Sequence, residues 1–567
     1  GDHRDLHSFP TRRSSDLQKE QTKSKSYVNS FYNAHLKDVF KEVQISPDMI
    51  DIYIMSLKGN TAAGVDGIFS EHFKYGNSLV LRSHLASLYS AIICWGVVPD
   101  NFKIGVISPI LKKPSLNPNV ENNYRPITVS SVHSKIIELY MLPSDNAAPT
   151  QFGFRKHRDT SIACAYLHDV ISYFHQANSP LYICSLDAEK CFDTIWHSGM
   201  FYKLLSVLPI SHWMFLYKWY SELQAVVKWK GRYSEIFKVT RGTRQGSLLS
   251  PKLFNIFIND MLLELQATEQ GVKIGKDKHN TCAYADDVTV FASSVNGLQT
   301  LIDVCHNYAT RWRFNFSAKK TKCMSVGKSL FRNEPTWKLG DKQIDVEPQL
   351  NILGVTYSQN NSYEKHVLNR ISSTQRVMFG LSTSGFTYPG LDTAAKLYIW
   401  KTTGVKCLSY GMESVHLTCS LHSRLNSVQG CTIKYVLGIS KRSHHSGLLS
   451  ALNLPNISEL INRDSVSLLH RVLKTSSPYR SLSAYFLSDY IVNSNDHNST
   501  LVSRVLAGGV SIKDIILASN KPLCKIQNCD KNSPGLVDSL KYLIYHPSFN
   551  YRNSTEHQLA QLLTKSF

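Results

Sequence analysis

The sequence lacks the features of a secreted or membrane-spanning protein. No run of uninterrupted apolar residues reaches the roughly 18 that a spanning helix needs, and no signal peptide opens the chain. Its 12 cysteines stand at irregular spacings without a C-x-x-C pair, which argues against a disulfide framework. We therefore expect a soluble, intracellular protein with free thiols.

Acidic residues are scarce as well. The chain has 43 Asp and Glu against 63 Lys and Arg, so its formal net charge is +20 at pH 7. This balance favours a polyanionic partner, with nucleic acid as the first candidate and a membrane surface as the competing one. With 567 residues, 43% of them apolar, the chain has material for roughly three or four packed domains or sub-domains.

The first residues do not resemble part of a fold. The segment HSFPTRRSSDL (residues 7–17) has no hydrophobic period, and it resembles the conceptual translation of a sequencing-library adapter. We interpret residues 1–17 as an adapter-derived scar. The alternative is a basic nucleic-acid-binding arm, because Arg12 and Arg13 are adjacent.

Local patterns in the middle of the chain indicate mixed α and β structure, and beyond about Tyr357 they indicate mainly helices. Ser46 offers a cap for an entry helix, and Ser250 offers a cap for a helix whose first residue is Pro251. The further predicted elements are helices at 79–95 and 198–208, strands at 104–111, 181–186 and 225–229, and a helical face formed by Leu298, Leu301, Ile302, Cys305, Tyr308 and Trp312.

Three carboxylates stand in unusual settings. Asp187 ends an apolar strand (LYICSLD), and Asp286 and Asp287 occupy a tight turn between two strand-like arms (AYADDVTVF). Adjacent carboxylates repel each other unless a cation neutralises them. Mg²⁺ suits such hard oxygen ligands, and two ions about 3.5–4 Å apart serve phosphoryl transfer. Taken alone, an Asp-Asp pair is more often a solvated turn.

Seven segments follow each other in the order found in reverse transcriptases. SLDAEKCFD (185–193) resembles the palm strand with the first catalytic aspartate, and YADD (284–287) resembles the catalytic hairpin. RGTRQGSLLSPKLFNIFIND (241–260) is similar to the template-and-nucleotide loop and its helix.

Four further blocks extend the resemblance on both sides. NNYRPITVSSVHSKIIE (122–138) and QFGFRKHRDT (151–160) resemble segments of the fingers and of the template contact. KKTKCMSVG (319–327) and LNILGVTYS (350–358) are similar to the palm lysine segment and the primer-grip hairpin. The motifs FGFR and RQG-x-L-x-P resemble those of reverse transcriptases from non-LTR (LINE-type) retrotransposons in particular.

The resemblance implies an α+β right-hand polymerase, with fingers, a palm built on an antiparallel sheet and a helical thumb. It implies fingers and palm over 59–358 (core about 104–358), preceded by a basic helical segment over 18–58 and followed by thumb and C-terminal extension over 359–567. The implied activity is RNA-directed DNA polymerisation. Its partners would be an RNA template, a DNA primer or target and deoxynucleoside triphosphates, in a ribonucleoprotein of the nucleus or cytoplasm.

The resemblance also implies roles for the acidic residues and one lysine. Asp187, Asp286 and Asp287 would hold two Mg²⁺ ions, and Lys320 would protonate the leaving pyrophosphate. Two neighbouring lysines, Lys319 and Lys322, are alternatives for that proton donor.

Nucleotide and template contacts are implied for five further residues. Arg125 would pair with the triphosphate, Gln245 would lie against the incoming base and sugar, and Phe192 would exclude a ribose 2′-hydroxyl. Core packing is the alternative for Phe192. Gly153 and Arg155 would contact the template backbone.

Some features depart from the family pattern. Only twelve residues separate Glu138 from Gln151, fewer than is usual in the family, and no endonuclease signature stands before or after the polymerase segments. We therefore expect a truncated element. A group II intron type reverse transcriptase with maturase function and a decayed RNA-binding relic are the alternatives.

The C-terminal third carries basic residues next to aromatic ones. Lys401 follows Trp400, and Arg480 follows Tyr479. Such pairs suit a surface that tracks a sugar-phosphate backbone and stacks on bases. Ordinary amphipathic helices are the alternative for any single pair.

Overall fold

The computed structural model describes residues 14–40, 42–143, 147–327, 335–388, 390–440, 442–475, 477–493 and 499–510. Two compact units share the chain. Unit 1 comprises Gly1–Ala148, Ala188–Glu264 and Val304–Ser317, and unit 2 comprises Pro149–Asp187, Leu265–Asp303 and Ala318–Phe567. Most of the segment interpreted as an adapter scar lies outside the described residues.

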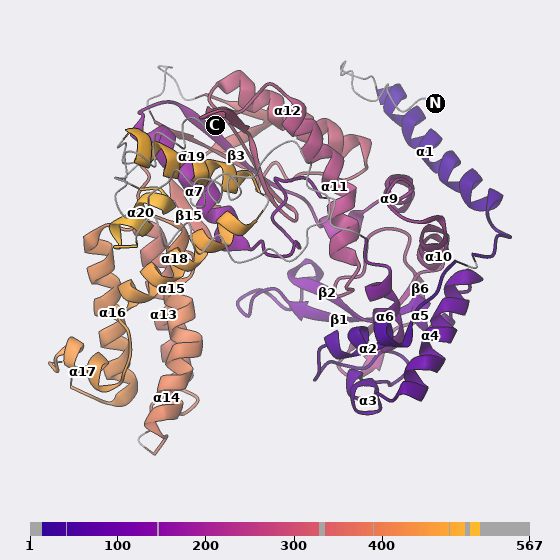
Figure 1. Ribbon diagram of the computed structural model, residues 1–567, viewed down its shortest axis with the longest axis horizontal. Coiled ribbons are helices and arrows are strands. Elements are labelled where there is room, and N and C mark those ends of the chain that lie inside the picture. The colour runs from indigo at the N-terminus through magenta and orange to yellow at the C-terminus, as the bar shows by residue number, and fades with distance from the viewer. Residues whose placement is uncertain are drawn as a thin grey trace, which may run out of the picture. The chain divides into compact units, whose positions relative to one another are not determined.

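Unit 1 combines short helices with a small mixed sheet (Figure 1). The predicted entry helix is confirmed: it begins after Ser46, whose side chain accepts a hydrogen bond from the Met49 amide. The helix predicted at 79–95 is also confirmed, with Ser78 as its cap. The helices are α1 (Ser14–Ala34), α2 (Pro47–Ser56), α3 (Ser70–Tyr75), α4 (Leu79–Cys94), α5 (Asp100–Lys103), α6 (Val132–Tyr140), α8 (Cys191–Thr194), α9 (His197–Leu204) and α10 (Ile210–Ser221).

The sheet of unit 1 has the strand order β2-β1-β4-β5, and β6 pairs with β4 beside β5. Strand β1 runs antiparallel to β2 and parallel to β4. The strands predicted at 104–111 and 225–229 are confirmed as β1 and β4. Their bounds are β1 (Ile104–Leu111), β2 (Tyr124–Val129), β4 (Gln224–Trp229), β5 (Arg232–Tyr233) and β6 (Phe237–Lys238).

Unit 2 is built on a second sheet, in the order β12-β13-β11-β3-β10-β9. The predicted apolar strand is confirmed as β3, which has antiparallel neighbours on both sides. The strands of the sheet are β3 (Leu181–Asp187), β9 (Thr281–Tyr284), β10 (Asp287–Ala292), β11 (Lys322–Val326), β12 (Trp337–Leu339) and β13 (Lys342–Val346). Two separate hairpins are formed by β7 (Val272–Ile274) with β8 (Asp277–His279) and by β14 (Gln349–Ile352) with β15 (Val355–Ser358).

Helices make up the rest of unit 2, so the prediction of a mainly helical last third is confirmed for its described part (Figure 1). Helix α7 shares one hydrophobic core with the sheet and with the C-terminal helices. These helices are α7 (Thr160–Gln176), α13 (Glu364–Ser382), α14 (Thr393–Ile399), α15 (Val405–Ser409), α16 (Cys419–Leu437), α17 (His445–Ala451), α18 (Ile457–Lys474), α19 (Pro478–Asn493) and α20 (Leu501–Ala507).

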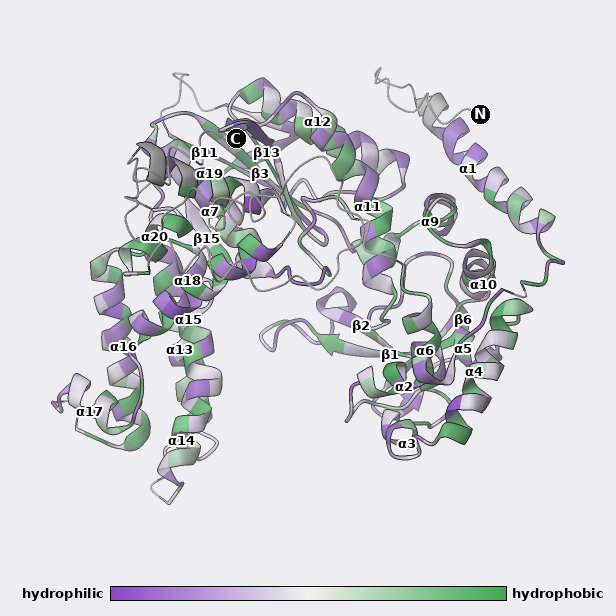
Figure 2. Ribbon diagram, in the orientation of Figure 1, coloured by the Kyte–Doolittle hydropathy of each residue, from purple (hydrophilic) through white to green (hydrophobic). Residues whose placement is uncertain are grey.

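Two long helices have residues in both units, α11 (Ser250–Ala267) and α12 (Val295–Arg311). The predicted apolar face at positions 298–312 is buried, and Figure 2 shows polar residues interspersed with these apolar ones along α12. The cap of α11 differs from the prediction. Ser250 is itself helical, and the hydroxyl of Ser247 accepts hydrogen bonds from the amides of Leu249 and Ser250.

The positions of Trp400 and Tyr479 favour the alternative of ordinary amphipathic helices over a surface that stacks on bases. Both side chains are buried, with 1% and 0% of their surface exposed, because they form part of the core of unit 2. The cysteines among the described residues carry free thiols, as predicted. Within the described ranges no helix is long and apolar enough to cross a membrane.

A buried carboxyl ties α7 to the last two helices. Asp169 accepts hydrogen bonds from the Tyr479 hydroxyl (2.8 Å) and from the Leu501 amide (3.0 Å). Burial raises the pKa of Asp169 to about 7, although Arg504 and these two hydrogen bonds act in the opposite direction. Since an unfolded Asp has a pKa of about 3.9, the folded state binds the proton more tightly.

We therefore predict that Asp169→Asn becomes more stable than the wild type as the pH rises. The uncharged amide can still accept from the Leu501 amide through its oxygen and can donate to the Tyr479 oxygen through its nitrogen, whereas ionised Asp169 costs on the order of 4 kcal/mol above pH 7. Urea unfolding at pH 5 to 8 measures the difference, with the exposed Asp303→Asn as the control. A constant difference across this range would contradict the assignment.

Candidate active site

The end of strand β3 brings three charged side chains together. Asp187 lies opposite Asp287 in the register of β3 and β10. On the other side of β3, Ser185 lies opposite Lys322 of β11, so the antiparallel register carries Lys320 to Asp187. The Lys320 Nζ lies 2.9 Å from Asp187 Oδ2. The structure thus joins four predicted site residues, with Asp286 next to Asp287 in the chain.

The predicted YADD hairpin is confirmed. Tyr284 pairs with Asp287 across the two strands, so Ala285 and Asp286 form a two-residue loop. Ala285 has a φ of 57°, in the left-handed region that residues with a side chain rarely adopt. Asp286 is half-buried and Asp287 is exposed.

The surroundings of Asp287 disfavour its ionised form. The pKa of Asp287 is raised to about 6, first by the loss of water around the carboxyl and then by the negative charges of Asp286 and Asp187. Lys320 acts in the opposite direction. A cation at this place would remove the repulsion.

The three predicted ligands do not by themselves form a metal-binding group. Among the described residues, no three or more His, Cys, Asp or Glu side chains are placed so that together they could hold a metal ion. Mg²⁺ commonly binds through one or two carboxylates and completes its shell with water and substrate phosphates. The facing pair Asp187 and Asp287, with Asp286 beside it, fits a metal held in this way.

One of the two predicted template residues, Gly153, lies next to this hairpin. Gly153 is buried, and a Cβ atom there would stand 2.4 Å from the Ala285 amide nitrogen, so the position requires glycine. Arg155 is half-buried. The observed neighbour of Gly153 is thus the turn at Ala285, and its contact with a template stays a prediction.

The three predicted nucleotide-binding residues belong to unit 1. Arg125 is exposed on β2, and the ring of Phe192 on α8 lies 4.8 Å from the ring of Phe254. The amide of Gln245 donates to Asp193 Oδ1 at 2.8 Å. These residues keep their predicted roles as hypotheses, and the ring contact of Phe192 also suits core packing.

The loop around Gln245 is held close to its neighbours by two glycines. Gly242 has a φ of 80°, and a Cβ there would meet the Asp193 carbonyl oxygen at 2.6 Å. Gly246 has a φ of 113°, and a Cβ there would meet the Thr128 carbonyl oxygen at 2.8 Å. Both glycines therefore permit close packing of this loop inside the protein.

Sequence reasoning missed two residues that hold these loops. Glu138 Oε2 accepts from the Ser247 hydroxyl (2.9 Å) and the Leu248 amide (2.8 Å), so it fixes the loop that carries Gln245. Burial raises the pKa of Glu138. Gln151 contacts the turn between β9 and β10. An acid at the end of an apolar helix (KIIE) was the available signal for Glu138, whereas no local pattern marks Gln151.

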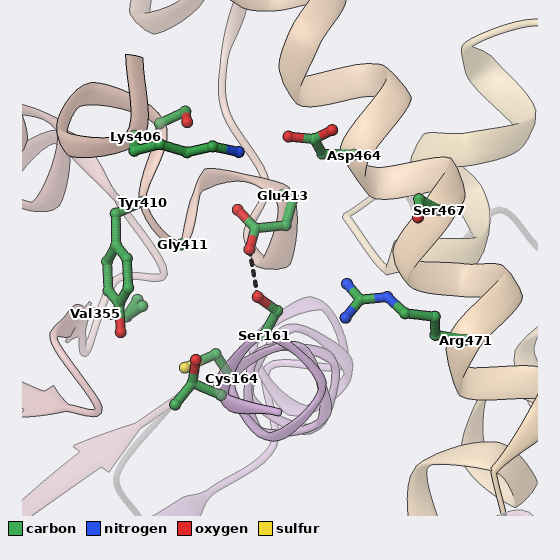
Figure 3. A pocket seen from close by; sticks show the side chains of 12 residues that line it. Ser161, Cys164, Val355, Lys406, Tyr410, Gly411, Glu413, Asp464, Ser467 and Arg471 are labelled. Carbon is green, nitrogen blue, oxygen red and sulfur yellow. Dashed lines mark hydrogen bonds between the residues drawn. The ribbon is translucent and has the colours of Figure 1, made fainter. Parts of the chain in front are cut away.

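Figure 3 shows a different hollow, of about 340 Å³, in unit 2. Its wall carries charges of both signs, with Lys406 and Arg471 facing Glu413 and Asp464. Glu413 accepts a hydrogen bond from Ser161 there. None of the carboxylates Asp187, Asp286 and Asp287 lines this hollow, so it is separate from the candidate site at the end of β3.

Comparison with known proteins agrees with this geometry. Residues 110–357 match the family model described as reverse transcriptase (RNA-dependent DNA polymerase). This segment, somewhat less than half of the chain, is thus similar to reverse transcriptases. The matched segment contains the nine predicted site residues and both alternative lysines: Arg125, Gly153, Arg155, Asp187, Phe192, Gln245, Asp286, Asp287 and Lys320, with Lys319 and Lys322 as the alternatives.

Curated relatives come from mobile elements of Drosophila melanogaster. The RNA-directed DNA polymerase from mobile element jockey is 24% identical over 410 residues, which cover 68% of this chain and 43% of that protein. The Pol polyprotein of the type-2 element R2DM is 30% identical over 210 residues, or 36% and 20% of the two chains. This chain thus spans less than half the length of these relatives.

Among solved structures, similarity extends to telomerase from Candida tropicalis in complex with a fragment of telomeric RNA. The TM-score is 0.34 at 12% identity, over 66% of this chain and 68% of that chain.

Proposed function

We propose that this chain is the RNA-directed DNA polymerase of a non-LTR retrotransposon and copies element RNA into cDNA. The observation that carries the proposal is the register of β3 and β10, in which Asp187 faces Asp287 beside Asp286 within the segment similar to reverse transcriptases. A primer-extension assay on an RNA template tests it. If the chain is a decayed relic, it should bind RNA without extending a primer. Against the group II intron alternative, the relatives described above come from the elements jockey and R2DM.

In this proposal Asp187, Asp286 and Asp287 bind a pair of Mg²⁺ ions. When bound, such ions lower the charge on the reacting phosphate and favour the ionised primer 3′-hydroxyl. Lys320 holds its ammonium group 2.9 Å from Asp187, where it can donate a proton to the leaving pyrophosphate. Arg125, Phe192 and Gln245 then bind and select the nucleotide.

The Asp286→Asn variant tests the carboxylates. The loss of one ligand charge should weaken the binding of both ions. We therefore expect the rate of primer extension to fall by at least about 100-fold, the scale of effect that misplaced catalytic groups have. The exposed Asp303→Asn serves as the control, because it removes the same charge outside the site. Extension by Asp286→Asn at the wild-type rate would contradict the metal assignment.

A basic and aromatic segment of unit 1 supports RNA as the partner. Residues 228–238 (KWKGRYSEIFK) are exposed throughout, and they contain four Lys and Arg against one Glu. The side chains of Trp229, Tyr233 and Phe237 are 45%, 59% and 44% exposed. Exposed rings stack on unpaired bases while cations follow the backbone, so this segment suits a single-stranded template.

We expect RNA affinity to fall with salt and to depend on this segment. Replacing Lys228, Lys230 and Arg232 by alanine removes three cations, so the slope of log affinity against log salt should shrink by about 2. Filter binding of single-stranded RNA at several salt concentrations measures the slope. The control replaces the exposed lysines of the β7–β8 hairpin, Lys273, Lys276 and Lys278. Equal slopes in both triple variants would contradict a local RNA surface.

The sugar-selection role of Phe192 is tested by Phe192→Val. A ring beneath the ribose clashes with a 2′-hydroxyl, so the smaller side chain should raise ribonucleotide incorporation and leave deoxynucleotide addition largely intact. A residue that only packs against Phe254 would instead cost about 1–3 kcal/mol of stability and lower the use of both nucleotides alike. The ratio of kcat/KM values for matched nucleotides, with thermal unfolding, distinguishes the two roles.

A further inference from the structure

The side chain of Gln151 lies against the turn between β9 and β10 and is fully buried. Its Oε1 accepts hydrogen bonds from the amides of Ala285 (2.9 Å) and Gly153 (2.8 Å). Its Nε2 donates to the carbonyl oxygen of Ala285 at 3.5 Å. One side-chain amide thus binds both the N–H and the C=O of Ala285.

Ala285 is the position of the turn that most needs such support. Its φ of 57° is unfavourable for a residue with a Cβ atom. Asp286 follows directly, and its amide belongs to the same peptide plane as the Ala285 carbonyl. Whatever fixes this carbonyl therefore also fixes the direction in which the chain enters Asp286 and Asp287.

The segment around Gln151 is itself held firmly. Residue 151 forms a parallel bridge with Ala283 of β9, and the Phe152 amide donates to the Ala283 carbonyl at 2.7 Å. The buried guanidinium of Arg158 donates to the carbonyl oxygens of Pro149 (2.6 Å) and Gln151 (2.8 Å). These contacts fix the backbone position from which the Gln151 side chain reaches Ala285.

We propose that Gln151 is a positioning residue for the metal-binding carboxylates: by holding both backbone polar groups of Ala285, it presents Asp286 and Asp287 to the divalent cation. This inference rests on the proposed function. Partners that orient metal ligands typically change metal affinity by about 10–100-fold when they are removed.

The Gln151→Met variant tests the proposal, because methionine keeps the length of the side chain and loses all three hydrogen bonds. We expect Mn²⁺ binding to the full-length protein to weaken about tenfold, measured through the electron paramagnetic resonance signal of free Mn²⁺. The Mg²⁺ concentration for half-maximal primer extension should rise by a similar factor.

The matched control is Gln266→Met. The Gln266 side-chain amide, on α11, donates to the hydroxyl of Thr150 at 3.4 Å. Thr150 directly precedes Gln151, so this contact involves the same segment but not the turn at Ala285. Mn²⁺ affinity should stay at the wild-type value in this control. An equal loss in both variants would contradict a specific role for Gln151.

A second change separates positioning from packing. Ala285→Gly removes the cost of the left-handed conformation, so in the Gln151→Met background it should restore part of the Mn²⁺ affinity. If Gln151→Met fails to fold, Gln151→Asn takes its place, because its shorter amide cannot reach both polar groups of Ala285.

The outcomes distinguish this inference from the proposed function. Wild-type Mn²⁺ affinity in the Gln151 variants, with a lowered melting temperature, would overturn the inference and leave the polymerase intact. A wild-type protein that neither binds Mn²⁺ nor extends a primer would instead overturn the proposed function, on which the inference depends.

Discussion

The repulsion between carboxylates at the end of β3 is the constraint on which the rest of unit 2 depends. Register places Asp187 opposite Asp287, and the turn adds Asp286 beside them. Repulsion and the loss of water raise the pKa of Asp287, and Lys320 offsets only part of this cost. A fold that keeps these groups together needs other contacts to hold the strands in register.

Those contacts come from the surrounding core. Strand β3 lies inside a sheet with antiparallel neighbours on both sides, and its buried residues join α7 and the C-terminal helices in one hydrophobic core. Buried polar contacts at Asp169 and Gln151 connect segments far apart in the sequence. The packing of the core and these hydrogen bonds thus offset the repulsion between the carboxylates. Such compensation is common at functional sites.

Much of this could be predicted from local patterns. The apolar strand before Asp187, the hairpin arms around Asp286 and the face of α12 follow from periods of two and of 3.6 residues. The order of the seven segments then indicated the polymerase. These signals are local in sequence. They concern helices and strands whose own pattern of apolar residues predicts which face is buried.

Other features depend on contacts that no local pattern contains. Gln151 and Ala285 stand 134 residues apart, and Glu138 and Leu248 stand 110 apart, so only the folded chain pairs them. The burial of Trp400 and Tyr479 shows the same limit. An aromatic residue beside a basic one gives no information on which of the two faces the core.

The central claim is that Asp187 and Asp287 bind the same cation or pair of cations. Mn²⁺ affinity of Asp187→Asn, Asp287→Asn and the double variant tests it most directly, as a double-mutant cycle. Our account predicts that either single change loses nearly as much affinity as both together. Losses that simply add, or affinity that neither change affects, would contradict a shared metal site at the end of β3.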